Sequence, residues 1–210
     1  MTYNITRTIT LALSLACLML TACSLRPDHQ QPTTYTLAPE RGAERAPADK
    51  LGDSEAKLAL MPVHAAPDLK SRRILIKRPG GITDYYADSR WSLVPAKLVR
   101  DFIEDSLIAR FGPRVVSHGQ RGSAAGYKLQ LRLRDFQAEY TQSTNTPPVV
   151  RVAVTADMHA GDPDDEAARK RFEVMQKADA NTMRDVRLAF EMALQKITDR
   201  MADQFLTDRL

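Results

Sequence analysis

Two stretches in the middle of the chain alternate strictly between apolar and polar residues. Leucine occupies every second position of residues 128–134, and residues 150–158 repeat the pattern with valine, alanine and methionine. Successive side chains of a β-strand point to opposite faces, so each stretch predicts a strand with one buried and one wet face. Sheets with a wet face are mostly antiparallel, because parallel sheets are usually covered on both sides. We therefore expect a mainly antiparallel sheet.

Further strands follow from shorter apolar runs bounded by turn residues. They are expected over residues 58–63, 73–78, 114–117 and 168–177, with a short β-prone patch at residues 35–37. Pro79, Gly80 and Gly81 predict a turn, after which residues 82–86 should pair back as a hairpin partner. Residues 38–57 and 118–126 have the composition of loops, and residues 161–166 that of an acidic turn.

Two segments carry the 3.6-residue apolar period of amphipathic helices. The first covers residues 93–111, with Pro95 in its first turn and Gly112 and Pro113 ending it. The second covers residues 182–206, and its apolar stripe consists of Val186, Phe190, Leu194, Ile197, Met201 and Phe205. Two such helices packed on one face of the sheet predict a single two-layer α+β domain over residues 35–210.

The N-terminal segment has the order of a targeting signal. Arg7 precedes residues 9–20, twelve residues without a charge, which as a helix span roughly 18 Å at about 1.5 Å per residue. That length falls short of the ~30 Å hydrocarbon core of a bilayer. Residues 1–22 therefore predict a signal peptide rather than a membrane span.

The sequence Leu20-Thr21-Ala22-Cys23 at the end of this segment resembles the lipobox of bacterial lipoproteins. Small residues allow a peptidase to cut between Ala22 and Cys23, and the thiol of Cys23 supplies the nucleophile that takes a diacylglycerol, with a further N-acyl chain. Ser24 follows rather than aspartate, which resembles the outer-membrane sorting signal of Gram-negative lipoproteins. Residues 23–34 are then a tether. A plain signal peptide cut nearby, or a stray buried cysteine, is the alternative.

Other functional classes find little support. The formal charge of +4 is scattered, which argues against nucleic acid binding. The four histidines lack the spacing of a zinc motif, and neither a hydrolase G-x-S-x-G nor a phosphate-binding loop occurs. The basic residues around Leu131 are better explained as the wet face of a strand than as a ligand site. Trp91, the only tryptophan, is interpreted as a core residue or an interface anchor rather than a ligand platform.

Taken in order, these features resemble the ABC-type transport auxiliary lipoproteins, the family of the PqiC-like component of MCE lipid-transport systems. The resemblance rests on Cys23, the Tyr35-x-Leu37 patch, the strands at 58–63 and 73–78, Trp91 before the first helix, the 128–134 strand and the long last helix. It implies a non-enzymatic accessory without catalytic residues, metal or cofactor, anchored at the outer membrane and facing the periplasm.

The resemblance also implies partners. They are the outer membrane bilayer and an MCE-domain protein with the ABC permease and ATPase of the same system, and further copies of the chain are a candidate partner. Tyr85, Tyr86 and Trp91 are candidate interface residues, because aromatic side chains carry much of the energy of protein interfaces. The alternative function is a different envelope assembly lipoprotein, such as a lipopolysaccharide-insertion partner or a peptidoglycan synthase activator.

Overall fold

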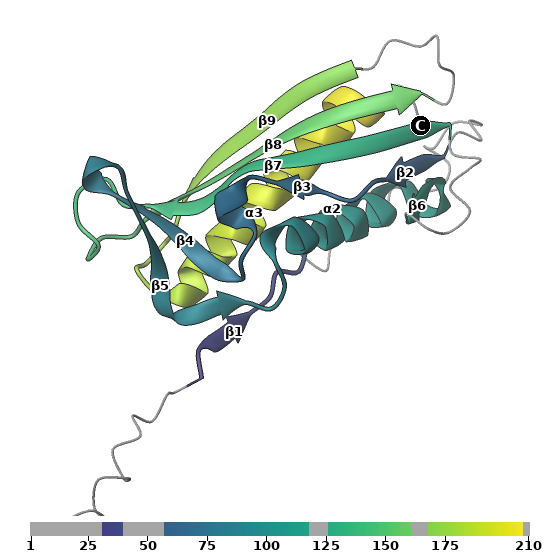
Figure 1. The fold of residues 1–210 in the computed structure, drawn as a ribbon. Coiled ribbons are helices and arrows are strands. Elements are labelled where there is room, and N and C mark those ends of the chain that lie inside the picture. Colours follow the sequence, from purple (N-terminus) through teal and green to yellow (C-terminus); the bar gives the residue numbers. More distant parts are fainter. Residues whose placement is uncertain (1–30, 40–56, 118–125, 161–167, 208–210) are drawn as a thin grey trace, which may run out of the picture. The chain divides into compact units, whose positions relative to one another are not determined.

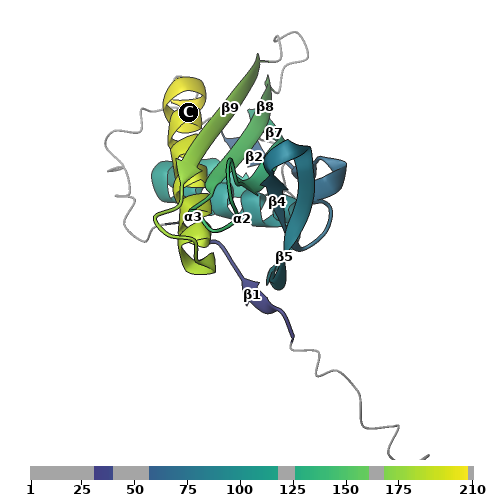
Figure 2. The ribbon, with the colours of Figure 1, turned by 90° about the vertical axis from the view of Figure 1, so that its left-hand side faces the viewer.

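The computed structural model describes residues 31–39, 57–117, 126–160 and 168–207. Within these ranges, nine strands form one mixed sheet, and two long helices lie on one side of it (Figures 1 and 2). The α+β class expected from the sequence is confirmed. The expected signal peptide, the lipobox and the acidic turn at 161–166 lie outside the described residues.

The longest strand, β7 (Tyr127–Glu139), organises the sheet. One of its edges pairs along its whole length with antiparallel β8 (Val149–Ala160), and β8 pairs in turn with antiparallel β9 (Ala168–Lys177). These three strands form a long meander, which is the part of the sheet that the alternating stretches predict.

The other edge of β7 pairs with three short strands that follow one another along the chain. β2 (Leu58–Leu60), β3 (His64–Ala65) and β4 (Arg73–Arg78) all run parallel to β7, at its start, middle and end. Pro62 lies in the first interruption, where its missing N–H cannot continue a ladder. Residues 58–78 therefore act as one broken strand beside β7.

The remaining strands extend the sheet beyond this broken strand. β6 (Val115–Ser117) pairs with β2 in parallel, and β5 (Ile82–Trp91) forms the predicted hairpin with β4 around the Pro79–Gly81 turn. β1 (Thr33–Tyr35) pairs in parallel with the last residues of β5. The first strand of the domain thus begins at Thr33, two residues before the domain start expected at residue 35.

The expectation of a mainly antiparallel sheet is wrong. Five of the eight strand pairings among the described residues are parallel, although the two longest ladders are antiparallel. The parallel strands other than β4, β5 and β7 have two or three residues each, which is too short to show a periodicity. Their direction follows from the path of the chain along β7 and not from any local pattern.

Strand β7 continues five residues beyond its predicted end at Arg134, and a β-bulge keeps its apolar face turned to the core. The register with β8 shifts between Leu133 and Asp135, so that Leu133 and Phe136 both face the core. Before and after the bulge, the core-facing residues are Leu129, Leu131, Leu133, Phe136 and Ala138, all at most 1% exposed. The strand therefore keeps one apolar face over its full length.

Helices α2 (Pro95–Phe111) and α3 (Met183–Met201) cover the apolar face. Pro95 lies in the first turn of α2, as expected, at its first position, and Gly112 ends the helix with a φ of 61°. The N-cap of α3 is Thr182, whose hydroxyl accepts from the Asp185 amide at 3.2 Å. The predicted stripe of α3 is buried from Val186 to Met201, and a π-helical turn, Ala202–Leu206, continues it. The predicted helix boundaries are thus confirmed to within a few residues. Neither described helix has the length and apolar character of a membrane span.

Candidate functional site

The residues expected at the lipidation site, Ala22 and Cys23, lie outside the described residues, so their role stays a prediction. The nearest described element is β1, whose carbonyl at Tyr35 accepts from the Ser92 amide at 2.6 Å. Leu37 follows and is 8% exposed, and the Ala38 amide donates to Glu191 of α3 at 3.0 Å. The chain is therefore fixed to both the sheet and α3 immediately after it enters the domain.

Trp91 is a core residue. It is fully buried at the end of β5, and its ring contacts Phe190 of α3 edge-on at 5.2 Å and Phe136 of β7 at 5.6 Å between centroids. The rings of Phe136 and Phe190 lie 4.5 Å apart. This aromatic trio joins the hairpin, the central strand and the last helix. Of the two interpretations of Trp91, the core role is the one this geometry supports, and its side chain offers no surface to a partner.

Tyr85 and Tyr86, the other candidate interface residues, are half-buried on β5. The guanidinium of Arg73 lies 3.6 Å from the ring centroid of Tyr85, in cation–π geometry. The Tyr86 hydroxyl lies 2.8 Å from that of Tyr140. Burial, together with this hydrogen bond and the proximity of Tyr140, raises the pKa of Tyr86 above its ordinary value. Both tyrosines have partners within the domain, and their role in an interface remains a prediction.

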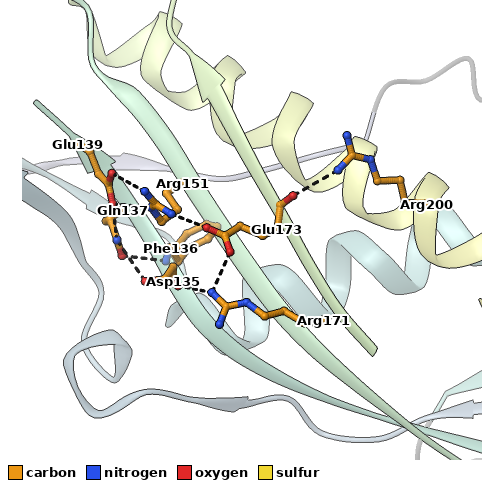
Figure 3. Close-up of polar contacts among 8 residues, drawn as sticks. All are labelled: Asp135, Phe136, Gln137, Glu139, Arg151, Arg171, Glu173 and Arg200. Carbon is orange, nitrogen blue, oxygen red and sulfur yellow. Dashed lines mark hydrogen bonds and ion pairs between the residues drawn. The ribbon is translucent and has the colours of Figure 1, made fainter. Parts of the chain in front are cut away.

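The most organised polar surface is the open face of β7, β8 and β9, the face turned away from the helices. Arg151 of β8 lies between carboxylates of both neighbouring strands: it donates to Glu139 of β7 at 2.8 Å and pairs with Glu173 of β9 (Figure 3). Arg171 of β9 also pairs with Glu173, at 2.9 Å, and lies 3.8 Å from Asp135. These residues form a charge ladder across the three strands.

The ion pairs of the ladder change the pKa values of Glu173 and Arg151. Partial burial alone would raise the pKa of Glu173, but hydrogen bonds from Arg151 and Arg171 outweigh it and hold that pKa below its ordinary value. The hydrogen bond to Glu139 raises the pKa of Arg151 further. Both shifts favour the charged forms of Glu173 and Arg151.

A second group of charges lies at the other end of the open face, centred on Asp157 of β8. The side chain of Asp157 is only 4% exposed and pairs with Arg132 of β7, at 3.0 Å, and with Arg169 of β9. One buried carboxylate thus holds two guanidinium groups, whose side chains remain 41% and 64% exposed. Such an arrangement orients arginine side chains toward solvent in a fixed geometry.

The sequence indicated the wet face of β7 but not these pairings. The alternation placed Arg132 on the polar side of β7, as the structure confirms, but its acidic partner lies on another strand. Only the register between β7, β8 and β9 brings the charges together. The sequence did hold one relevant signal. The two alternating stretches carry opposite charges at their polar positions, Arg132 in one and Asp157 in the other.

Two pockets of the described residues border the helices. A shallow pocket of about 290 Å³ lies between Pro62 and the start of α2, lined by Val94 and Lys97, and another of about 260 Å³ borders Leu188 and Met192 of α3. Within the described ranges, no three side chains of histidine, cysteine, aspartate or glutamate gather as metal ligands would.

Comparison with known families assigns this fold. Residues 35–202 match the family described as the ABC-type transport auxiliary lipoprotein component. The chain belongs to this family. The match begins at the last residue of β1 and ends just after α3, so it covers nearly all of the described domain. This auxiliary lipoprotein is therefore a component of an ABC-type transport system.

Solved structures show the same fold at low sequence identity. A crystal structure of a Xanthomonas campestris protein of family DUF330 is 20% identical, with 82% of this chain and 91% of that chain covered and a TM-score of 0.60. A crystal structure of an uncharacterized protein, 11% identical, covers 83% of this chain and 99% of that chain with a TM-score of 0.63. At these identities the likeness extends to the fold alone. The comparison with curated proteins returned no match.

Proposed function

We propose that this auxiliary lipoprotein is anchored to the outer membrane through acyl chains on Cys23 and serves an MCE-type ABC system that moves lipids or hydrophobic solutes between membranes. The observation that carries the proposal is the family match over residues 35–202, preceded in the same chain by the Leu20-Thr21-Ala22-Cys23 motif. The domain acts without catalysis, as a binding component on the periplasmic side.

The length of the tether supports this role. Residues 24–32 separate Cys23 from β1, and an extended chain of this length reaches roughly 30 Å at about 3.3 Å per residue. Two or more acyl chains hold a protein stably at a bilayer, each buried CH₂ contributing about 0.8 kcal/mol. A domain on such a tether stays close to the membrane surface, where it meets a complex that spans the periplasm.

Replacement of the cysteine tests the anchor. We expect Cys23→Ala to leave an uncut precursor without acyl chains, because the modified sulfur is what the processing peptidase recognises. Labelling with radioactive palmitate and the mobility of the chain on a gel measure both effects, and Cys17→Ala is the matched control. A Cys23→Ala chain that is cut and recovered in the membrane as the parent is would contradict the anchor.

Crosslinking tests the transport role. Crosslinking in cells that carry the full-length chain, followed by mass spectrometry, should recover an MCE-domain protein or an ABC subunit. Recovery of lipopolysaccharide-assembly or peptidoglycan-synthesis proteins alone would contradict the transport role and favour the envelope assembly function.

A further inference from the structure

We propose that the open face of β7, β8 and β9 is a docking surface for an acidic patch on a partner protein, bound by Arg132, Arg169 and Arg171. We call these three residues the arginine group. The inference rests on the proposed function, because it takes the partner to be a subunit of the transport assembly. It adds which face docks and what chemistry the partner presents.

The sheet register brings the arginine group together. Arg169 lies opposite Asp157, and on the next row Arg132 and Arg171 flank Thr155 from either side. Neighbouring strands lie about 4.8 Å apart, and residues two apart along a strand are about 6.8 Å apart. The three guanidinium groups therefore spread over one small area of a rigid three-stranded sheet.

At the Asp157 end of the open face, two arginines share a single carboxylate, so positive charge is in excess there. Asp157 supplies one carboxylate for both Arg132 and Arg169. Arg171 shares Glu173 with Arg151, and its distance to Asp135 is 3.8 Å. The arginine side chains are 41%, 64% and 57% exposed, so their remaining N–H donors face solvent. Guanidinium groups held in this way bind carboxylates in bidentate geometry at little further cost in side-chain entropy.

The rest of the open face favours a protein over an anionic lipid surface. The same face also carries the carboxylates of Asp135, Glu139 and Glu173, so an anionic bilayer lying flat on the sheet would meet negative charges beside the arginines. Met175, in the row of Arg151, is 55% exposed and offers an apolar contact. A folded partner can match both ends of this face with different side chains, whereas a lipid surface cannot.

The test places a photo-crosslinking amino acid, benzoylphenylalanine, at Thr155 of the full-length chain in cells, with a second position at Arg184, which is exposed on α3. Crosslinked peptides are sequenced by mass spectrometry. The double variant Arg169→Ala with Arg171→Ala removes two exposed cations and leaves Asp157 paired with Arg132. The matched control, Arg78→Ala with Arg184→Ala, removes the same charge from elsewhere, and thermal melts confirm that both variants fold.

We expect the Thr155 position to crosslink an aspartate- or glutamate-rich segment of another protein. The Arg169 and Arg171 variant should lower the yield at least tenfold, while the control keeps it. In an Arg169→Glu chain, changing an acid of the crosslinked segment to arginine should restore the adduct. Lipid adducts alone, adducts only with another copy of this chain, no adduct at Thr155, or a yield that does not depend on the arginines would each overturn the inference.

The identity of the partner separates this inference from the proposed function. If the acidic segment belongs to an ABC or MCE subunit, both are supported. If it belongs to an unrelated envelope protein, the docking surface stands and the transport role fails. If ABC or MCE subunits crosslink only through other faces of the domain, the transport role stands and the docking surface fails.

Discussion

Single side chains of this domain act mainly through partners on other strands. Glu173 illustrates this, because two arginines from β8 and β9 hold its pKa below the ordinary value of 4.5. A carboxylate with a lowered pKa stabilises the folded state above its ordinary pKa, and this contribution is lost as the pH falls through the lowered value. The contribution of Glu173 to the stability of the fold is therefore lost at acid pH.

We expect Glu173→Gln to lower the stability at pH 7 and to have a smaller effect at pH 3, because below the ordinary pKa of 4.5 the carboxylate is protonated in the unfolded chain and its contribution to stability declines. Urea unfolding of the two proteins at both pH values measures the difference. Met175, 55% exposed on the same strand, gives a control in Met175→Ala, which should show no such pH dependence. An equal loss of stability for Glu173→Gln at pH 7 and pH 3 would contradict the assigned charge pairing.

A chain of hydroxyl groups near the hairpin supplies a second prediction. The Tyr140 hydroxyl donates to Asn181 at 2.8 Å, and Asn181 donates to the Thr144 carbonyl at 2.7 Å, so the Tyr86 hydroxyl must donate to Tyr140. Tyr86→Phe leaves the Tyr140 oxygen without its donor and should cost about 1–3 kcal/mol. Tyr85→Phe is the control, since the Tyr85 ring contact needs no hydroxyl. Equal urea midpoints for the Tyr86 variant and the parent would refute this hydrogen-bond order.

At the scale of elements, α3 holds the sheet together through the aromatic trio. Phe190→Ala removes its ring contacts with Trp91 and Phe136 and leaves a cavity at a fully buried site, at a cost of about 3–5 kcal/mol. Met192→Ala on the exposed side of the same helix should cost far less, since Met192 is 38% exposed. Denaturant unfolding of both variants compares the two. Similar losses would show that α3 does not pack on the sheet through this face.

The elements that the sequence predicted well are those with a long local pattern. The bounds of β4 and β9 match the expected ones, because charged or turn residues enclose each apolar run. The parallel strands β1, β2, β3 and β6 could not be oriented, because two or three residues carry no period and their partners are distant in the chain. The site shows the same limit: the wet face of β7 was predictable, whereas the pairing of Arg132 with Asp157 depends on the register with β8.

For the whole molecule, the first described segment is part of the fold and not of the tether. A chain that starts at residue 40 lacks β1, the buried Leu37 and the contact of Ala38 with Glu191. Loss of the Leu37 side chain alone should cost about 2–5 kcal/mol. Urea unfolding should show a lower midpoint for this chain than for one that starts at residue 32. Identical midpoints would assign residues 33–38 to the tether.

The parallel pairing of β1 with the end of β5 has a mechanical consequence. The chain enters β1 at Thr33, and the strand runs alongside Ser89, Arg90 and Trp91 in the same direction. A force on the preceding segment along the strand axis loads the hydrogen bonds between β1 and β5 in shear. All of them must then break together, instead of one after another from an end. The buried side chain of Leu37 and the hydrogen bond of Ala38 to Glu191 then resist the same force as a second attachment. If the domain is tethered as proposed, this geometry suits it to carry mechanical load while it binds a partner.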